Sequence, residues 1–231
     1  MSDRERQISE RVQAVRARIA AAARACGRDP ASVRLLAVSK GFPVEDLRAA
    51  QAAGQTCFGE SYLREALPKL AALTDPAPEW HYLGPLQANK TRPIAERFAW
   101  VHSLDRLKLA QRLNDQRPAG LPPLAVCLQV NLSGEARKSG VSPDQLDTLA
   151  QAVVALPRLR LCGLMAIPAP TPVLAAQRAA FRRLSDMRDA LNAAGYALDT
   201  LSMGMSDDLE AAITEGATLV RVGSALFGAR G

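Results

Sequence analysis

The stretch RLLAVSKGFPVEDLRAAQAAGQTCFGE, residues 34–60, decides the fold class of this chain. It opens with an apolar run, residues 35–39, that is typical of a buried strand. A helical segment follows, and a second short strand is expected at residues 56–59. This order of strand, helix and strand favours two parallel strands joined by a crossover helix.

The same alternation continues to the end of the chain. Further strands are expected at residues 80–83, 100–103, 124–131, 159–167, 198–203 and 218–223. Eight strand–helix units predict an α/β fold, a single (β/α)8 TIM barrel, and 231 residues suit one such domain spanning residues 1–231. A doubly wound open sheet is the alternative, but no GxGxxG motif follows the first strand.

Two helices have readable sequence signals. The first is an extra N-terminal helix that Gly27 should end, with one apolar face formed by Ile8, Val12, Val15 and Ile19. The second should begin at a capping box, in which Ser142 and Gln145 flank a proline at the first helical position. Its buried face is expected to hold Leu146, Leu149, Val153 and Leu156.

Composition narrows the class of protein. Hydrophobic residues make up 48% of the chain, which supports a core, and no apolar run is long enough to span a membrane. The charged N-terminus has no signal-peptide core, so we expect a soluble, cytoplasmic protein. The net charge is +6, yet basic and acidic residues are interleaved without an aromatic–basic stripe, so specific nucleic acid binding is not expected.

The cysteines and histidines do not form a metal-binding pattern. Four cysteines lie far apart without a CxxC pair, and three fall in predicted strands, where thiols pack as small apolar groups. His81 and His102 each end a predicted strand, and two such ligands without a carboxylate cluster make a poor metal site. We expect a structural or ligand-packing role for both histidines, and no metal.

Lys40 is the candidate nucleophile. It follows the first strand and is one of only five lysines among 29 basic residues, the others being arginines. A guanidinium cannot deprotonate to become a nucleophile, whereas a desolvated amine can react with a carbonyl. The alternative is a lysine that extends along apolar surface and leaves its amine in solvent.

The ends of the seventh and eighth strands carry the features of an anion site. Gly204 and Gly223 allow close backbone approach, and Ser206 and Ser224 supply hydroxyls before helix starts. An ordinary helix N-cap at Ser206 is the alternative, and the two following aspartates, Asp207 and Asp208, should repel a phosphate unless they turn away.

Together the mouth of the barrel would hold an amine, an anion site across the barrel from it, and Arg221 on the eighth strand. A phosphorylated aldehyde satisfies all three groups, and pyridoxal 5′-phosphate is the candidate cofactor.

Ordered motifs over almost the whole chain resemble the pyridoxal-phosphate homeostasis protein family. They are LLAVSK at 35–40, FGE at 58–60, EWHYLGPLQANK at 79–90, VHSLDR at 101–106, RLRLCGLMAIPAP at 158–170, LSMGMSDDLEAAI at 201–213 and VRVGSALFGAR at 220–230. The resemblance implies a barrel like the N-terminal domain of alanine racemase, which agrees with the strand count.

The resemblance also implies roles for particular residues. Lys40 would hold the cofactor as a Schiff base, and Arg221 would face the pyridine nitrogen and weaken the ring as an electron sink. The remaining cofactor contacts that it implies are Met203, Gly204, Ser206, Gly223 and Ser224.

Two further positions stay open. Lys138 lies in the loop where the family carries a second amine suspected of handling cofactor transfer, although a solvated charge explains it equally well. Ser61 stands where the family usually has asparagine, and its single hydroxyl donor is not expected to replace the amide.

These observations favour a protein that binds pyridoxal 5′-phosphate and buffers or delivers it without enzymatic turnover. The alternative is an amino-acid racemase, but racemases of this barrel type use a second domain for which no residues are left, and Tyr62 and Tyr82 at the mouth lack a basic partner. A sugar-phosphate enzyme is a third interpretation and would need paired carboxylates at strand ends, where Glu60 stands alone outside the 206–208 turn. We expect a monomer whose partners are the cofactor and the apo-enzymes that require it.

Overall fold

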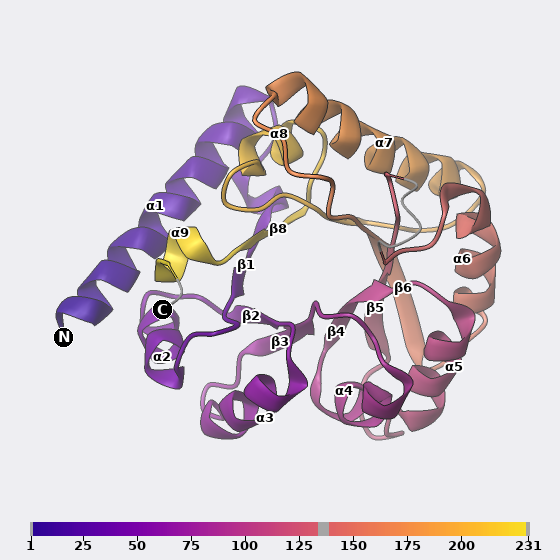
Figure 1. The fold of residues 1–231 in the computed structure, drawn as a ribbon, viewed down its shortest axis with the longest axis horizontal. Helices are drawn as coiled ribbons and strands as arrows, with labels where there is room; N and C mark the ends of the chain where they lie inside the picture. The colour runs from indigo at the N-terminus through magenta and orange to yellow at the C-terminus, as the bar shows by residue number, and fades with distance from the viewer. Residues whose placement is uncertain (1, 134–138, 230–231) are drawn as a thin grey trace.

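The computed structural model describes residues 2–133 and 139–229. Within these residues, eight parallel strands close into a barrel in chain order (Figure 1). The strands are β1 (Arg34–Val38), β2 (Cys57–Glu60), β3 (Glu79–Tyr82), β4 (Trp100–Leu104), β5 (Leu124–Gln129), β6 (Leu159–Met165), β7 (Thr200–Ser202) and β8 (Leu219–Val222). The predicted (β/α)8 barrel is therefore confirmed.

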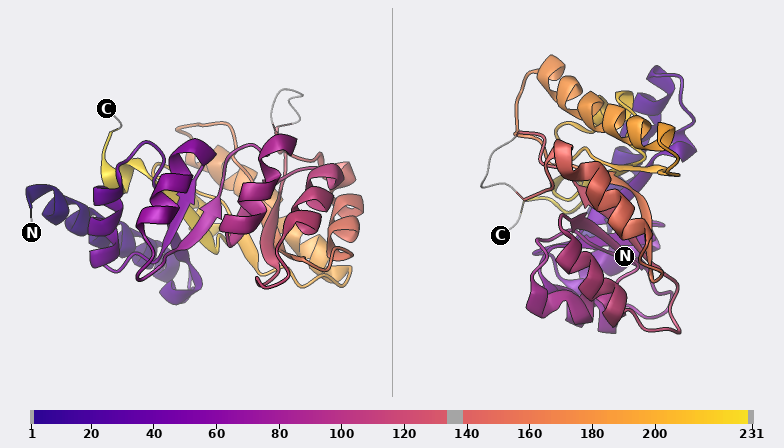
Figure 2. Two further views of the ribbon diagram at one scale, coloured as in Figure 1. Left: turned by 90° about the horizontal axis from the view of Figure 1, so that it is seen from below. Right: turned by 90° about the vertical axis from the view of Figure 1, so that its right-hand side faces the viewer.

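The helices form a ring outside the strands (Figure 1). They are α1 (Asp3–Ala25), α2 (Val44–Ala52), α3 (Leu63–Ala72), α4 (Thr91–Arg97), α5 (Leu107–Gln116), α6 (Leu146–Val154), α7 (Leu174–Ala193), α8 (Leu209–Thr214) and α9 (Ser224–Phe227). The extra helix α1 runs along α2, α8 and α9 and extends past the barrel on one side (Figure 2).

Helix α1 follows its sequence signals closely. Its start is a capping box in which Ser2 accepts the Glu5 N–H and the Glu5 carboxylate accepts the Ser2 N–H. The expected apolar face is buried and consists of Ile8, Val12, Val15 and Ile19, together with Ala23. The helix ends at Ala25, and Gly27 adopts a positive φ of 73°, which glycine tolerates without strain.

The capping box predicted at Ser142 is wrong. The Ser142 side chain makes no cap hydrogen bond; the Gln145 N–H, which a capping box would direct to the Ser142 hydroxyl, donates to the Ser142 backbone carbonyl at 3.1 Å. Pro143–Gln145 form a short 3₁₀ turn, and the α-helix begins one turn later at Leu146. The predicted buried face is confirmed for Leu146, Leu149 and Val153, while Leu156 lies beyond the helix and is only partly buried.

Several predicted strands extend too far at their ends. The sequence predicts a seventh strand over residues 198–203, but only Thr200–Ser202 pair in the sheet. The fifth strand ends at Gln129; the next residue, Val130, still donates its N–H to the Met165 carbonyl of β6 at 2.8 Å and also forms an isolated bridge with Val141. Six strands end one or two residues earlier than predicted, whereas β2 and β4 end one residue later, at Glu60 and Leu104.

The apolar residues form one large layer and two small clusters. The large layer packs strand residues such as Ala37 and Phe58 against helix residues such as Leu47 and Ile94. Because successive side chains of a strand point to opposite faces, Leu36 points away from this layer and clusters with Cys57 and Leu219. A second interior cluster consists of Trp100, Ala125, Cys127, Cys162 and Met165.

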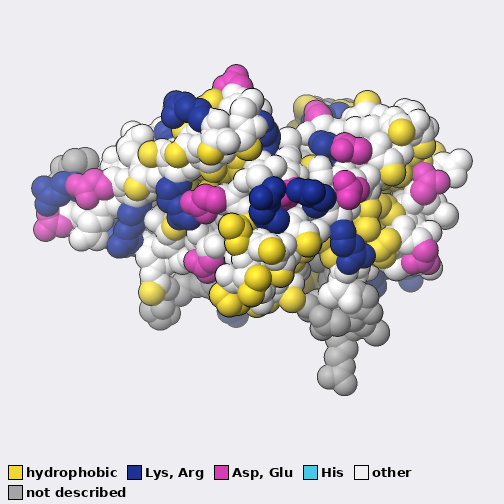
Figure 3. All heavy atoms as spheres, turned by 90° about the horizontal axis from the view of Figure 1, so that it is seen from above, with side chains coloured by type: hydrophobic (Ala, Val, Ile, Leu, Met, Phe, Trp, Pro, Cys, Tyr) yellow, Lys and Arg dark blue, Asp and Glu magenta, His cyan; other side chains and the backbone are white. Residues whose placement is uncertain are grey.

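The surface matches the interleaved charges of the sequence. Seen from above the view of Figure 1, the molecule shows Lys and Arg side chains interspersed with Asp and Glu (Figure 3). Among the described helices, none has the length and apolar character that crossing a membrane requires.

Candidate functional site

Lys40 lies at the carboxyl end of β1, in a tight turn at the barrel mouth. The strand ends at Val38, and the turn continues through Gly41, whose φ of 78° lies in the left-handed region. The Gly41 N–H donates to the Glu65 carboxylate at 2.9 Å. Lys40 is partly buried.

A buried polar group supports this turn from behind, and we call Ser39, Glu60 and Lys69 the turn cluster. The Lys69 ammonium on α3 lies 2.7 Å from Glu60 Oε1 and donates to the Ser39 carbonyl at 2.8 Å. The Ser39 hydroxyl donates to the same Glu60 oxygen at 2.6 Å. Burial nevertheless raises the pKa of Glu60, and it outweighs the opposing effect of both partners.

The sequence did not reveal the turn cluster. Glu60 is a strand-end acid in the sequence, but its carboxylate contacts Lys69 of α3 rather than forming half of a catalytic carboxylate pair. Lys69 sits inside a helical segment, where a lysine is usually solvated. The available signal was that it is one of only five lysines in an arginine-rich chain.

Ser206 and Ser224 come together at the mouth, as predicted. The Ser224 hydroxyl lies 3.1 Å from the Ser206 hydroxyl, and the Ala225 N–H donates to Ser206 Oγ at 3.4 Å. Ser224 is the first residue of α9, and Gly223 stands at its N-cap position. We call these two hydroxyls and the N–H groups at the start of α9 the cradle.

The two predicted glycines allow this close approach. Gly204 has a φ of 90°, and a Cβ there would lie 2.5 Å from the Ala212 Cβ. A Cβ on Gly223 would lie 3.1 Å from the Val38 carbonyl oxygen, which is tighter than ordinary contact. The end of β8 therefore lies directly against the end of β1, next to the turn that carries Lys40.

The position of the cradle corrects one expectation from the sequence. The anion site was expected across the barrel from Lys40, but β8 pairs with β1 in register, with Leu36 opposite Arg221 and Ala37 opposite Val222. The reason is closure of the barrel, which makes the last strand a neighbour of the first. Lys40 and the cradle are thus side by side at adjacent strand ends.

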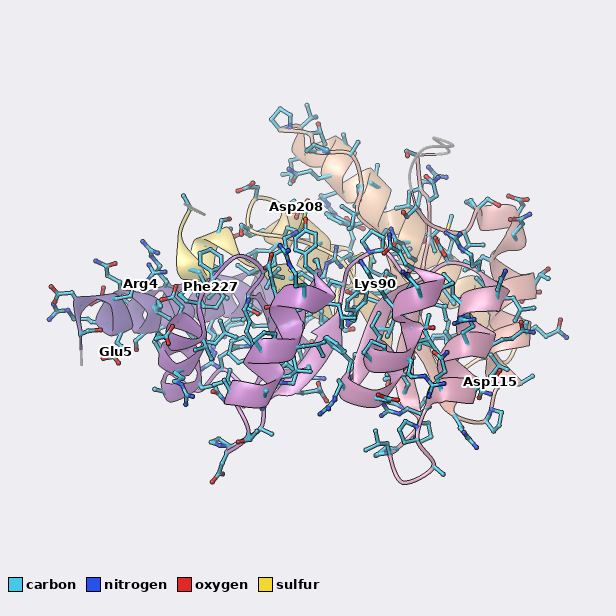
Figure 4. All side chains as sticks on the ribbon, turned by 60° about the horizontal axis from the view of Figure 1, so that its bottom comes forward. Arg4, Glu5, Lys90, Asp115, Asp208 and Phe227 are labelled. Atoms are coloured by element: carbon cyan, nitrogen blue, oxygen red, sulfur yellow. The ribbon has the colours of Figure 1, made fainter. Side chains whose placement is uncertain are left out.

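The acidic residues after Ser206 do not form a helix cap for it. Helix α8 begins at Leu209 with Asp208 at its N-cap position, so the interpretation of Ser206 as an ordinary N-cap is wrong. The Asp208 carboxylate accepts the Met205 N–H at 2.6 Å, and burial raises its pKa. Asp208 is labelled in Figure 4, and Asp207 is exposed. Asp208 is therefore committed to its own loop.

Helix α1 holds both halves of the cradle in place. Arg18 donates to the Ser206 carbonyl at 3.0 Å and pairs with Glu210 at 2.8 Å. At the other end of α1, Arg4 donates to the Phe227 carbonyl at 2.9 Å, at the end of α9 (Figure 4). The extra N-terminal helix thus fastens the loop after β7 and the short helix after β8.

Arg221 lies inside the barrel, with its guanidinium near the carboxyl ends of β6 and β7. Its Nη1 donates to both the carbonyl and the hydroxyl of Ser202, the latter at 2.9 Å, and Nη2 donates to the Ala166 carbonyl at 3.0 Å. Burial lowers the pKa of Arg221 to about 10, so the side chain keeps its charge at neutral pH. Met203, for which the family resemblance implies a cofactor contact, follows β7 and is buried in the large apolar layer.

The two positions whose roles the sequence left open are Lys138 and Ser61. Lys138 lies outside the described residues. Ser61 follows β2 and packs tightly, because a Cβ on Gly84 would lie 2.0 Å from its carbonyl oxygen. Next to these loops, a cavity of about 360 Å³ opens at the mouth; it is lined by residues that include Leu83, Gln129, Asn131 and Ile167.

Comparison with known proteins gives consistent results. The model of the alanine racemase N-terminal domain family matches residues 11–231. The pyridoxal phosphate homeostasis protein of Pseudomonas aeruginosa is 65% identical over 223 residues, which cover 96% of each chain. The chain belongs to the pyridoxal phosphate homeostasis protein family. Its relative of that name in Escherichia coli K12 is 50% identical over 226 residues, covering 96% of this chain and 97% of the relative.

Solved structures agree with this family membership. A crystal structure of a protein from Bifidobacterium adolescentis superposes with a TM-score of 0.90 at 34% identity, covering 98% of this chain and 97% of that one. PipY of Synechococcus elongatus, solved with pyridoxal phosphate bound, superposes with a TM-score of 0.84 at 37% identity, covering 96% and 100%. Alanine racemase from Corynebacterium glutamicum is 18% identical with a TM-score of 0.67, over 94% of this chain and 62% of that one, and shares the fold.

The described residues fit a phosphorylated aldehyde. An amine lies beside a pair of hydroxyls and the N–H groups at the start of α9, and both positions open on the barrel mouth. The nearby Asp208 carboxylate is taken up by Met205, which reduces its repulsion of a phosphate. A buried guanidinium lies below the mouth for a ring nitrogen.

Proposed function

We propose that this protein binds pyridoxal 5′-phosphate at the barrel mouth and buffers or delivers it. The observation that supports this most strongly is the pairing of β1 with β8, which sets Lys40 beside the cradle. The binding of pyridoxal phosphate by PipY, which shares the fold at 37% identity, supports the same conclusion. In this proposal the whole chain, residues 1–231, acts as one cofactor-binding domain and as a monomer.

Lys40 is the residue proposed to hold the cofactor covalently. When bound, the cofactor supplies an aldehyde that condenses reversibly with a primary amine and releases water. The turn cluster contributes by fixing the backbone next to Lys40, since Lys69 holds the Ser39 carbonyl and Glu60 holds the Ser39 hydroxyl. The fixed backbone therefore holds the Lys40 amine at one position in the mouth, while its condensation with the aldehyde stays reversible.

The cradle is proposed to hold the phosphate through neutral donors. Ser206 and Ser224 offer hydroxyls, and the start of α9 offers backbone N–H groups whose dipoles favour an anion. Gly204 and Gly223 let the backbone approach closely enough for these contacts. Because the hydroxyls are neutral and open to solvent, the phosphate can leave again, as delivery to an apo-enzyme requires.

Arg221 is proposed to keep the bound ring unreactive toward amino acids. A guanidinium donates hydrogen bonds and keeps its proton, so it does not protonate the pyridine nitrogen that it faces. An unprotonated ring is a weak electron sink, and carbanion chemistry at the substrate α-carbon slows accordingly. Holding and releasing the cofactor need no electron sink and remain.

The tyrosines near the mouth support binding over racemisation. Racemisation needs a base on each face of the α-carbon. Tyr82 packs its ring against Phe98 in the apolar layer and donates to the Pro85 carbonyl at 3.4 Å. Tyr62 is 55% exposed. Neither is held as a second base opposite Lys40.

A transfer experiment tests this proposal. Protein loaded with pyridoxal phosphate is mixed with an apo-enzyme that needs the cofactor, and the activity that appears is compared with that from the free cofactor. In parallel, a chiral assay follows alanine, serine and other amino acids with the loaded protein. We expect transfer without racemisation, whereas robust racemisation that disappears in Lys40→Ala would establish a racemase instead.

A further inference from the structure

A row of hydrogen-bonded polar side chains crosses the interior of the barrel. His81 Nε2 lies 2.8 Å from Glu79 Oε1, and His81 Nδ1 lies 2.8 Å from His102 Nε2. His102 Nδ1 lies 2.8 Å from the Ser202 hydroxyl, which in turn accepts from Arg221 Nη1 at 2.9 Å. We call Glu79, His81, His102, Ser202 and Arg221 the relay.

The relay runs from one end of the barrel to the other. Glu79 is the first residue of β3 and therefore lies at the amino ends of the strands, which we call the floor of the barrel. Its carboxylate accepts from Arg34, the first residue of β1, at 2.6 Å. At the other end, the guanidinium of Arg221 contacts the carbonyl of Ala166, which follows β6. The relay therefore connects the floor with the mouth, where the cofactor is proposed to bind.

The Glu79 end of the relay fixes the direction of donation, because an ionised carboxylate only accepts and each neutral imidazole that donates from one nitrogen accepts at the other. Ser202 Oγ accepts from Arg221, which can only donate, and its own proton is directed at His102 Nδ1 when that nitrogen accepts. A neutral His102 that accepts at Nδ1 carries its proton on Nε2 and donates to His81 Nδ1. His81 then carries its proton on Nε2 and donates to the Glu79 carboxylate, which accepts only.

The surroundings favour neutral imidazoles and an ionised Glu79. Burial lowers the pKa of His81 and of His102, and the hydrogen bond from His81 lowers the pKa of Glu79 to about 2. The charged groups that face the relay are Arg34 at Glu79 and Asp208 at Arg221, with the Cys127 thiol beside the latter. A reversed relay would need a protonated Glu79, which the lowered pKa of this carboxyl disfavours.

The side chains in the middle of the relay are completely buried and tightly packed. The His81 ring stacks on Trp100, with centroids 5.4 Å apart and planes within 8°. His81 and His102 have no exposed surface, and neither has Ser202. A side chain in such surroundings cannot rotate to another partner without leaving a buried polar group unsatisfied.

We propose that His81, His102 and Ser202 are positioning residues that hold the Arg221 guanidinium in one orientation toward the mouth. Nη1 is committed to Ser202 and one N–H of Nη2 to the Ala166 carbonyl, so the second N–H of Nη2 and the Nε–H are the ones that could reach a ligand. Because every proton in the relay points toward Glu79, the relay supplies no proton to the mouth. Its effect on the cofactor rests on the proposed function of Arg221 at the pyridine nitrogen, whereas its direction of donation does not.

Nuclear magnetic resonance of the cofactor-free protein tests the direction of the relay. The chain has two histidines, and both belong to the relay, so long-range proton–nitrogen spectra contain two imidazole signals to assign. We expect both rings to be neutral with the proton on Nε2, between about pH 5 and 8. A proton on Nδ1 of either ring, or protonation of either ring in that range, would overturn the proposal.

Two variants test whether the relay positions Arg221. Ser202→Ala removes the group between His102 and Arg221, whereas Ser202→Thr keeps a hydroxyl as the matched control. We expect Ser202→Ala to leave the proton of His102 on Nε2, because the contacts from Glu79 through His81 remain, and to make the nitrogen signal of bound ¹⁵N-labelled pyridoxal phosphate pH-dependent. Ser202→Thr should retain the wild-type tautomer and a pH-independent signal.

The outcomes separate this inference from the proposed function. If the wild-type protein shows the expected tautomers but binds no cofactor, the proposed function fails and the relay stands. If the cofactor binds and its nitrogen signal is the same in wild type and Ser202→Ala, the positioning role is wrong. The wild-type tautomers decide the direction of donation even if Ser202→Ala does not fold.

Discussion

The turn cluster and the relay are two buried polar groups that solve the same problem in different ways. Each supports one residue proposed to contact the cofactor: the turn cluster holds the turn of Lys40, and the relay holds Arg221. The turn cluster lies between the barrel and α3 and depends on an ion pair. The relay lies inside the barrel and depends on neutral imidazoles between charged ends.

The pKa values of the two carboxyl groups, Glu60 in the turn cluster and Glu79 in the relay, shift in opposite directions. Burial is the largest influence on Glu60 and raises its pKa even though Lys69 is 2.7 Å away. For Glu79 the hydrogen bond from His81 outweighs burial and lowers its pKa to about 2. A deeply buried ion pair can thus be less favourable for its carboxylate than a partly exposed contact to an imidazole.

The largest effect that distinguishes the two groups should come from Lys69→Met. This change leaves Glu60 buried without its charged partner, and removing one member of a buried pair typically costs about 3–5 kcal/mol of unfolding free energy. Urea unfolding at neutral pH measures the loss. The exposed Lys108 offers the matched control Lys108→Met, and a loss in Lys69→Met no larger than in this control would contradict the role of the turn cluster.

Replacing the pair with apolar side chains sharpens the same test. Lys69→Met combined with Glu60→Leu removes both charges, so much of the lost stability should return. If the double variant is as unstable as Lys69→Met alone, the turn needs the specific hydrogen bonds to Ser39 rather than charge compensation.

The cradle should behave differently from both buried groups, because its hydroxyls reach solvent. Ser206→Ala combined with Ser224→Ala should weaken pyridoxal phosphate binding at least about tenfold, since hydrogen bonds to a charged group contribute roughly 1.5–3 kcal/mol each. Unfolding free energy should hardly change. The measurement is a binding titration with pyridoxal phosphate beside unphosphorylated pyridoxal, which should be much less sensitive.

A matched control for the cradle is Ser142→Ala, because the Ser142 side chain makes no cap hydrogen bond. It should bind like the wild type. Unchanged affinity in the double variant, or an equal loss for pyridoxal, would show that the phosphate is held elsewhere.

The smallest effect should appear in the pH dependence of stability, where the two carboxylates act with opposite sign. The folded pKa of Glu79 is lowered from 4.5 to about 2, so its contribution is complete above the unfolded value and is lost as pH falls toward 2. The folded pKa of Glu60 is raised, so its ionisation lowers stability as pH rises above 4.5.

Substitution by glutamine separates these two slopes. We would measure the free energy of unfolding in urea between about pH 3 and 7. Glu79→Gln should reduce the loss of stability below pH 4.5, whereas Glu60→Gln should remove a loss of stability as the pH rises above 4.5. Identical changes of slope in both variants would mean that burial does not distinguish the two sites.

The fold could be predicted because its signals are local and repeated. The apolar strand before Lys40 and the periodic apolar face of α1 each require only nearby residues, and both are confirmed. The start of α6 could not be predicted correctly from Ser142 and Gln145. The Gln145 N–H donates to the Ser142 backbone carbonyl, which makes a 3₁₀ turn, and the side-chain pattern does not reveal this choice.

The site was predictable where it follows strand ends and unpredictable where it crosses the barrel. Ser206 and Ser224 come from successive loops and meet as expected. The contact between His102 and Ser202 joins residues 100 positions apart, and no local pattern marks it. One signal was present, since Glu79 and His81 are two residues apart on one strand and therefore share a face.

The central claim is that Lys40 holds pyridoxal phosphate at the mouth, and reductive labelling tests it most directly. The protein is loaded with pyridoxal phosphate, reduced with borohydride, digested and mapped by mass spectrometry, with Lys40→Ala treated in parallel. The account predicts that the pyridoxyl group is found on the peptide containing Lys40 and is lost in Lys40→Ala. An adduct found on Lys138 alone, or scattered over the other lysines, would contradict it.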